Sequence, residues 1–425
     1  MNTYINPSRE RWAELCRRAE QNNDLIRERV EEILSRVECE RDAALYALAE
    51  QIDGVKLSSL RVSSEEFAEA ERKISEDLKQ AIEQAISNIE TFHRAQLPAE
   101  VVVETMPQVR CVQRAVPIQR VGLYIPGGTA PLFSTVLMLA VPARVAGCRR
   151  VVLCTPTNKQ GKVAAEVLYA ASRAGVEEVY KVGGAQAVAA MAFGTESVPK
   201  VDKIFGPGNR YVTLAKQQVA TRSTAIDMPA GPSEVMVMAD GSAEPSFVAA
   251  DMLSQAEHGL DSQAMLVCCS AEFALKVEAE LERQMAQLSR KEYLAESLLN
   301  SRIVVFESKE KMIEFANEYA AEHLIISMEE AWAVADQIVA AGSVFVGNYS
   351  PESAGDYASG TNHTLPTSAW ARSYGGVNVD SFMRKMTLQQ LTQESLARLS
   401  PTIITMAQAE GLEAHAAAVS IRIHP

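Results

Sequence analysis

Four of the six histidines lie in segments that also carry acidic or amide side chains. These histidines are His258 in SQAEH, His323 in EHLI, His363 in GDYASGTNHTLP and His415 in EGLEAH. Imidazole, carboxylate and amide groups are ligands that a borderline divalent ion such as Zn²⁺ takes in proteins. The segments are far apart in the sequence, so the pattern predicts a metal site that the fold must assemble.

The segment Gly355–Pro366 has the composition of a loop, with Gly, Pro, Ser, Thr and Asn throughout. Loops of this kind lie at the surface and often carry function. It holds an oxygen ligand, Asp356, close to the imidazole of His363. Upstream, Gln255 and His258 are spaced i and i+3 in a predicted helix, which is a workable geometry for two ligands. Taken alone, such a Gln/His pair is more often a surface or hydrogen-bonded pair.

Hydrophobic periodicity predicts the elements that must position these groups. Between residues 121 and 219, short apolar strands alternate with helices, which indicates parallel βαβ units and a doubly wound sheet. The second half of the chain repeats the pattern, so two related sheets are expected. Helices are expected over residues 8–51 and 63–95, and again after Ser381, where residues 387–418 form a small terminal unit.

Three of the strand-to-helix turns carry paired or near-paired glycines, which lie in Pro126-Gly-Gly, Gly183-Gly184 and Gly206-Pro-Gly-Asn209. Glycine there lets a phosphate approach the backbone N–H groups at a helix N-terminus. Glycine is also common in such turns without any ligand, and no GxGxxG fingerprint is present. The three turns together favour nucleotide binding but leave the cofactor open.

Composition excludes several classes of function. The 425-residue chain has a formal net charge of −13 and a pI near 5.2, with no basic run, which argues against nucleic-acid binding. No apolar run approaches the ~20 residues needed to cross a bilayer, and no secretory signal is evident. The seven cysteines form no CxxC pair. A disulfide framework is therefore not expected, and a cytoplasmic location fits.

Six sequence runs closely resemble histidinol dehydrogenase, and the resemblance covers nearly the whole chain. The runs are GLYIPGGTAPLFSTVLML, VGGAQAVAAMAFGTESVPKVDKIFGPGN, IDMPAGPSEV, LSQAEHG, EHLI and SPESAGDYASGTNHTLP. The resemblance implies an NAD-dependent, zinc-containing enzyme that oxidises L-histidinol by four electrons, through L-histidinaldehyde, to L-histidine, the last step of histidine biosynthesis. It also implies an intertwined homodimer whose active sites are shared between subunits.

The fold class that follows is α/β, with two incomplete Rossmann-like, doubly wound parallel-sheet domains and small helical segments at the two termini. Residues 23–123 and 233–380 are expected to form the first α/β domain, which carries the metal and catalytic residues. Residues 124–232 are expected to form the second, which binds NAD. Residues 1–22 are expected to be an N-terminal helical segment, and residues 381–425 a C-terminal helical domain that reaches the partner subunit.

The resemblance also implies the site residues, one matching position at a time. The zinc ligands fall on Gln255, His258, Asp356 and His415, the last contributed across the dimer. The catalytic pair falls on Glu322 and His323. The NAD contacts fall on Tyr124, Gln186 and Asn209, each on one of the glycine turns. The substrate contacts fall on Ser233, Gln255, His258, His323, Asp356, His363, Glu410 and His415.

Two other functions compete with this interpretation. An enzyme of the same superfamily could oxidise another small alcohol, such as a sulfonated diol, but it is expected to differ at the substrate-reading positions. A catalytically silent, zinc-stabilised dimer would not need Glu322 and His323, and both are present. Two further histidines, His93 and His424, are expected to be a surface helix residue and a tail residue.

Overall fold

The computed structural model describes residues 1–18, 24–127, 131–222, 224–229 and 231–423. The chain forms two compact units, of which the larger comprises Met1–Gln96 and Gln119–Phe382 and the smaller Leu97–Ile118 and Met383–Pro425. No helix in these described ranges is long and apolar enough to cross a membrane.

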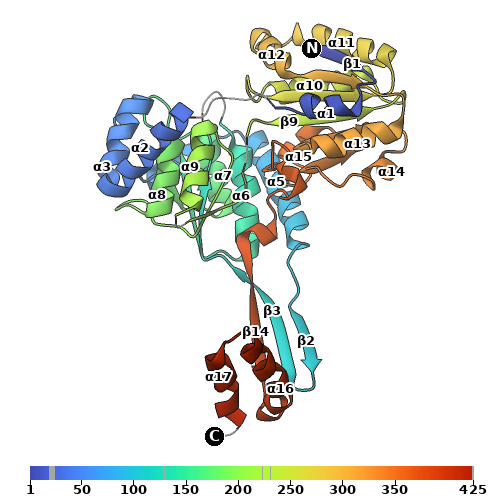
Figure 1. Cartoon of the computed structure of the whole chain (residues 1–425). Helices are drawn as coiled ribbons and strands as arrows, with labels where there is room; N and C mark the ends of the chain where they lie inside the picture. The colour runs from blue at the N-terminus through green and yellow to red at the C-terminus, as the bar shows by residue number, and fades with distance from the viewer. Residues whose placement is uncertain (19–23, 128–130, 223, 230, 424–425) are drawn as a thin grey trace. The chain divides into compact units, whose positions relative to one another are not determined.

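The larger unit contains a six-stranded, fully parallel sheet, drawn mostly in yellow and orange in Figure 1. Its central strand β9 (Glu234–Ala239) is buried along its whole length, as expected for a strand covered on both faces. Val235 and Val237 pack against α10 (Pro245–Ala256) and α11 (Ala271–Met285), while Met236 and Met238 pack against α13 (Lys309–Tyr319) on the other face. The strand order is β1 (Asn2–Ile5), β11 (Arg302–Val305), β10 (Gln263–Cys268), β9, β12 (His323–Ser327) and β13 (Ser343–Val346).

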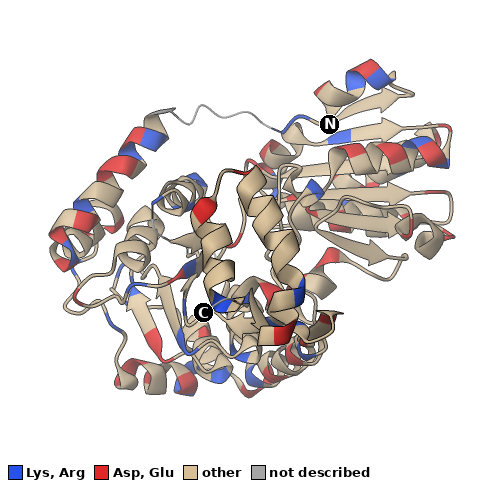
Figure 2. Ribbon diagram, turned by 60° about the horizontal axis from the view of Figure 1, so that its bottom comes forward, with Lys and Arg blue, Asp and Glu red and all other residues tan. Residues whose placement is uncertain are grey.

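The larger unit also contains a five-stranded parallel sheet, so the predicted fold class is confirmed. Its strand order is β6 (Glu178–Lys181), β5 (Arg150–Thr155), β4 (Arg120–Tyr124), β7 (Lys203–Phe205) and β8 (Ala225–Ile226). The helices that follow these strands are α6 (Phe133–Ala146), α7 (Ala165–Ala174), α8 (Gly184–Phe193) and α9 (Arg210–Ala220). Figure 2 shows the Lys, Arg, Asp and Glu residues mainly on helices.

Helices from the first hundred residues pack against the helices of the five-stranded sheet. In this group, α2 (Asp24–Glu40) contacts α8 and α9, α4 (Ser64–Lys73) contacts α7, and α5 (Glu76–Arg94) contacts α6. The sequence had grouped residues 23–123 with the six-stranded sheet. Because both sheets belong to one compact unit, the boundaries of two separate α/β domains stay a prediction.

The smaller unit is built on a three-stranded antiparallel sheet of order β14 (Met383–Leu391), β3 (Val109–Pro117) and β2 (Val101–Met106). Two helices, α16 (Gln393–Ala409) and α17 (Glu413–Ile423), complete it. Residues 383–391 were expected to begin a helical segment, and this expectation is wrong. All nine residues of β14 pair with β3, and such tertiary pairing overrides weak local preference.

Three further local expectations differ from the structure. Residues 2–5, placed in an N-terminal helical segment, form the edge strand β1 because they pair with β11. The single helix expected over residues 63–95 is broken at Ile74, whose backbone is extended, and Ser75 caps the next helix. His93 is fully buried instead of lying on the surface, whereas His424 lies outside the described residues.

Candidate active site

Of the two catalytic candidates, His323 begins strand β12 and Glu322 directly precedes it, at the amino edge of the six-stranded sheet. Helix α13 ends at Ala320 in the left-handed conformation, with φ 52°, and the chain turns at once into the strand. Glu322 and His323 are buried, with exposed fractions of 5% and 4%. In the sheet His323 pairs with Val235 of β9, which brings both candidates beside the start of that strand.

The backbone of one residue, Glu234, contacts both candidates through its two flanking peptide groups. The backbone N–H of Glu234 donates to Glu322 Oε2 at 2.9 Å, and the carbonyl oxygen of Glu234 lies 3.4 Å from His323 Nδ1. A carbonyl only accepts hydrogen bonds, so this contact assigns the proton to Nδ1. The His323 Nε2 atom is then a free acceptor, and it has no hydrogen-bond partner among the described residues.

Two helices bring the metal-ligand candidates together. Gln255 lies in the last turn of α10, and His258 follows just after it. Asp356 lies on α15 (Glu352–Tyr357), so the segment predicted as a loop begins as a short helix. Ligand atoms of His258, Glu352 and Asp356 all lie within 4.8 Å of one another, and the distance from His258 Nε2 to Asp356 Oδ2 is 4.0 Å.

Buried polar atoms without a partner are concentrated in this cluster. They include both amide atoms of Gln255, both carboxylate oxygens of Glu352, Asp356 Oδ1 and His323 Nε2. Such atoms are normally hydrogen-bonded, since an unsatisfied buried polar group costs about 1–3 kcal/mol. A set of imidazole, amide and carboxylate donors that all lack partners fits a bound divalent cation.

The carboxyl groups of the cluster have perturbed pKa values. Burial raises the pKa of Asp356 to about 6, and burial together with neighbouring carboxylates raises the pKa of Glu322 and of Glu352. Burial lowers the pKa of His323 to about 3, so its imidazole is neutral near pH 7. Crowded acids of this kind are costly as anions unless a positive charge lies among them. The raised pKa values of these carboxyl groups therefore support the same conclusion as the unpartnered atoms, namely that the cluster fits a divalent cation.

Two of the predicted substrate contacts border the cluster. His363 Nδ1 lies 2.9 Å from the backbone oxygen of Asp356, and its Nε2 lies 3.2 Å from Thr135 Oγ1. Burial lowers the pKa of His363 to about 4. Ser233 directly precedes Glu234, and its carbonyl accepts from the backbone of Gln263 at 3.2 Å. The structure thus brings His363 and Ser233 to the same edge of the sheet as the catalytic pair.

The three NAD candidates lie at the carboxyl ends of strands of the other sheet. Tyr124 ends β4, and its hydroxyl accepts from the N–H of Gly184 at 3.1 Å. Gln186 is buried in the first turn of α8. Asn209 caps α9, with its Oδ1 accepting from the N–H groups of Tyr211 and Val212. This edge is where ligands bind open parallel sheets.

Close packing accounts for two of the glycines in these turns. A Cβ on Gly206, whose φ is +125°, would lie 2.1 Å from the carbonyl oxygen of Tyr124. A Cβ on Gly183 would lie 2.6 Å from Cβ of Pro156. Any side chain would therefore push the turns apart, whether or not a phosphate binds there. Nucleotide binding at these turns stays a prediction.

The remaining predicted site residues lie in the smaller unit. Glu410 caps the C-terminus of α16, His415 lies in the first turn of α17, and both are exposed. Their contribution to metal and substrate binding stays a prediction.

Glu352 is a member of the cluster that the sequence did not single out. It stands one helical turn before Asp356, and its exposed fraction is 0%. Reading the segment SPESAGDY as a helix would have placed both acids on one face by their i, i+4 spacing. The loop-like composition of the following residues concealed that signal.

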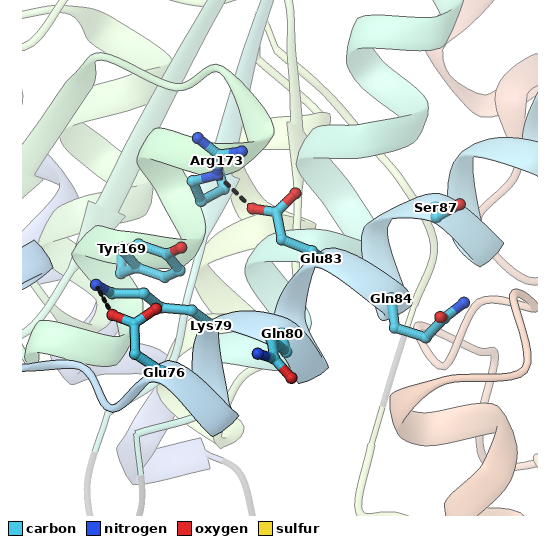
Figure 3. Close-up of a pocket in the computed structure, with 8 residues that line it drawn as sticks. All are labelled: Glu76, Lys79, Gln80, Glu83, Gln84, Ser87, Tyr169 and Arg173. Carbon is cyan, nitrogen blue, oxygen red and sulfur yellow. Dashed lines mark hydrogen bonds and ion pairs between the residues drawn. The ribbon is translucent and has the colours of Figure 1, made fainter.

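A hollow of about 600 Å³ lies away from this cluster, between α5 and α7 (Figure 3). Its lining carries no histidine or cysteine, and its charged groups are largely paired with one another, Lys79 with Glu76 at 2.8 Å and Arg173 with Glu83. It offers no set of catalytic groups.

Two parallel sheets and a buried cluster of His, Gln and acidic residues define an α/β enzyme. A family model for histidinol dehydrogenase matches residues 16–423. The chain is 54% identical over 418 residues to histidinol dehydrogenase of Bacteroides thetaiotaomicron, covering 98% of each chain. It is 51% identical over 428 residues to that of Yersinia pestis, covering 99% of this chain and 96% of the relative.

The comparison of structures points to the same family. The crystal structure of histidinol dehydrogenase from Elizabethkingia anophelis superimposes with a TM-score of 0.97 at 49% identity, covering 100% of this chain and 98% of that one. The chain belongs to the histidinol dehydrogenase family. It is therefore an oxidoreductase of histidine biosynthesis.

Proposed function

We propose that the protein oxidises L-histidinol, through L-histidinaldehyde, to L-histidine in an NAD-dependent, zinc-containing site in the cytoplasm. The observation that carries this proposal is the group of unpartnered buried atoms around Glu322 and His323. Family membership supports the substrate and the overall reaction. The reaction removes two hydrides and therefore four electrons.

The donor set suits a zinc ion held by Gln255, His258 and Asp356, with His415 from the partner subunit as the fourth ligand. A zinc ion bound there would act mainly as a template that anchors the substrate. Tyr124, Gln186 and Asn209 would hold NAD, which accepts a hydride at each oxidation.

His323 is proposed to remove the proton in the first oxidation. Its Nε2 is a free acceptor, and the imidazole is neutral because burial lowers its pKa to about 3. The alcohol O–H gives its proton to Nε2 as the carbon loses a hydride, which leaves the aldehyde. Glu234 holds Nδ1 on the opposite side of the ring.

Glu322 is proposed to act in the second oxidation, which requires the elements of water. Burial raises the pKa of Glu322, which makes its carboxylate a stronger base than an exposed one. It takes a proton from the water that adds to the aldehyde carbon. The resulting hydrate anion then loses the second hydride to NAD, and the product is the carboxylic acid.

Ser233, His363 and Glu410 are proposed to orient the substrate. Holding the reacting carbon against the hydride acceptor can lower the barrier by several kcal/mol. Near the cluster, His363 is fixed by contacts of both ring nitrogens, so it can offer a defined face to the substrate imidazole or amine.

A homodimer with shared active sites is proposed on the surface of the smaller unit. Strand β2 is exposed along its whole length, and Val101, Val102 and Val103 are about half exposed. Met406 on α16 and Ile421 on α17 are exposed at 61% and 67%. A bare apolar edge strand invites pairing with another chain, and a second copy is the occupant consistent with a ligand donated across the dimer.

The test is the stoichiometry of NADH formed when L-histidinol is consumed to completion. Two NADH per histidinol, lost on adding a chelator and restored by zinc, are expected. One NADH per histidinol would indicate a simple alcohol dehydrogenase. No NADH from a folded, zinc-loaded dimer would refute histidinol as substrate and direct the search to other small alcohols, such as sulfonated diols.

A further inference from the structure

We propose that Arg18, through its ion pair with Glu234, is a positioning residue that holds the backbone of Glu234, which contacts both Glu322 and His323. The inference rests on the proposed function, since it concerns the same catalytic pair. Arg18 lies near the N-terminus, 216 residues from its partner in the chain. None of the motifs that carry the family resemblance includes it.

The ion pair is bidentate and largely buried. Arg18 Nε donates to Glu234 Oε2 and Nη2 donates to Glu234 Oε1, both at 2.8 Å. The exposed side-chain fractions are 17% for Arg18 and 1% for Glu234. A planar guanidinium paired with a carboxylate in this way fixes orientation as well as distance.

Arg18 is itself held on several sides. Its Nη2 donates to the carbonyl of Tyr319 at 2.7 Å, and its Nη1 donates to the carbonyl of Cys16 at 2.9 Å. The guanidinium carbon lies 3.7 Å from the centre of the Tyr319 ring. The Tyr319 hydroxyl donates in turn to Gln263 Oε1 at 2.6 Å, on strand β10. One guanidinium thus joins the end of α13, just before Glu322, to the start of β9.

The ion pair between Arg18 and Glu234 affects the catalytic pair. With its side chain clamped, Glu234 is fixed so that its N–H donates to Glu322 and its carbonyl accepts from His323. That orientation keeps the proton on His323 Nδ1 and leaves Nε2 free to accept. A buried ion pair is by itself weak evidence for a gain in stability. Fixing one arrangement of the surrounding groups is a better-attested role for such a pair.

The experiment compares Arg18→Gln with Arg302→Gln. Arg302 is the matched control because it also ties down the N-terminal segment, donating to the carbonyls of Leu15 and Arg17, yet within the described part of the chain it forms no hydrogen bond or ion pair with Glu234. Both proteins are measured as zinc-loaded full-length enzymes for kcat, KM and zinc content. Arg18→Gln should lower kcat by about 30- to 100-fold, the effect of misplacing a catalytic group, with KM within about 3-fold. Arg302→Gln should keep kcat within about 3-fold of wild type.

Guanidinium at low millimolar concentration should partly restore kcat of Arg18→Gln and leave Arg302→Gln unchanged. Equal kcat in the two variants would overturn the proposal, because Arg18 would then only dock the N-terminal segment. If Arg18→Gln fails to fold, Arg18→Lys carries the test, since it keeps the charge but loses the paired donors. Its kcat should fall about 10-fold, and an unchanged kcat would equally overturn the proposal.

A second readout does not depend on histidinol being the substrate. Ring-nitrogen NMR of ¹⁵N-histidine-labelled protein reports which nitrogen carries the proton, and only six histidines need assignment. His323 should be the Nδ1–H form in wild type and in Arg302→Gln, and a mixture in Arg18→Gln. A wild type that leaves histidinol untouched would sink the proposed function, whereas an unchanged His323 tautomer in Arg18→Gln would sink the positioning role.

Discussion

Glu352 Oε1 lies 3.7 Å from Nδ1 of His323, and neither oxygen of Glu352 has a hydrogen-bond partner within the described ranges. The carboxylate thus faces the ring that is proposed to receive a proton. A negative charge at that position stabilises the imidazolium that forms. Glu352 is therefore expected to support turnover, although no role was assigned to it from the sequence.

Glu352→Gln keeps the side-chain volume and removes the charge. We expect kcat for histidinol to fall by about 10- to 100-fold, the range usual for lost stabilisation of a proton transfer. Glu257→Gln is the control, since Glu257 is an exposed acid next to His258. Steady-state kinetics of both variants check this, and matching kcat values would remove Glu352 from the mechanism.

His323→Ala removes the proposed base but no proposed zinc ligand. Turnover should drop by about 10²- to 10⁴-fold, the usual contribution of a general base. Zinc content, measured by atomic absorption, and dimer mass should stay those of wild type. A metal-free variant would mean that His323 holds the ion and does not act as the base.

Glu322→Gln should separate the two half-reactions. Only the second oxidation adds water, so turnover of L-histidinaldehyde should fall at least about 10-fold more than the first hydride transfer from histidinol. Stopped-flow recording of NADH formation from each substrate measures the two losses. Equal losses would refute water activation by Glu322 and leave it a structural partner of the Glu234 backbone N–H.

His415→Asn tests the contribution of the smaller unit to the metal. Changing a residue that only hydrogen-bonds to a metal ligand already lowers metal affinity about 10- to 100-fold. Removing one of the four proposed ligands should therefore lower the zinc affinity by at least roughly that factor. Competition with a chromogenic chelator measures it. His93→Asn, at a buried histidine outside the cluster, serves as a control for general effects of such a change. Unchanged zinc affinity in His415→Asn would exclude the C-terminal segment from the site.

Asp251, on α10 one turn before Gln255, gives a prediction about stability and pH. Burial raises its pKa from 3.8 to about 7. The pKa of Asp251 is higher in the folded than in the unfolded protein, so ionising this carboxyl group costs more free energy in the folded state. The free energy of unfolding therefore decreases as pH rises from about 4 to 7. Asp251→Asn should therefore stabilise the zinc-free protein by about 1–3 kcal/mol at pH 7.5 and by clearly less at pH 5.5. Urea unfolding at the two pH values checks this, and a gain that does not depend on pH would contradict it.

Much of the parallel-sheet architecture could be predicted because its signals are local. Strands β4, β5, β6 and β7 are short apolar runs bounded by turn residues, and the helices between them begin and end near the expected positions. The edge strand β1 and the strand β14 could not be predicted in this way. Neither has a strong pattern of its own, and each is a strand because of the partner it pairs with.

The sequence by itself determined the family and the kinds of group at the site, since long motifs and the rare histidines with their acidic or amide neighbours can be read without coordinates. The structure then brought Gln255, His258, His323, Asp356 and His363 to one edge of a sheet. Only the tertiary structure decided which charges are buried and what they face. Glu352 is an unpartnered acid beside His323, and Glu234 is clamped by Arg18, because burial and pairing depend on distances between residues remote in the chain.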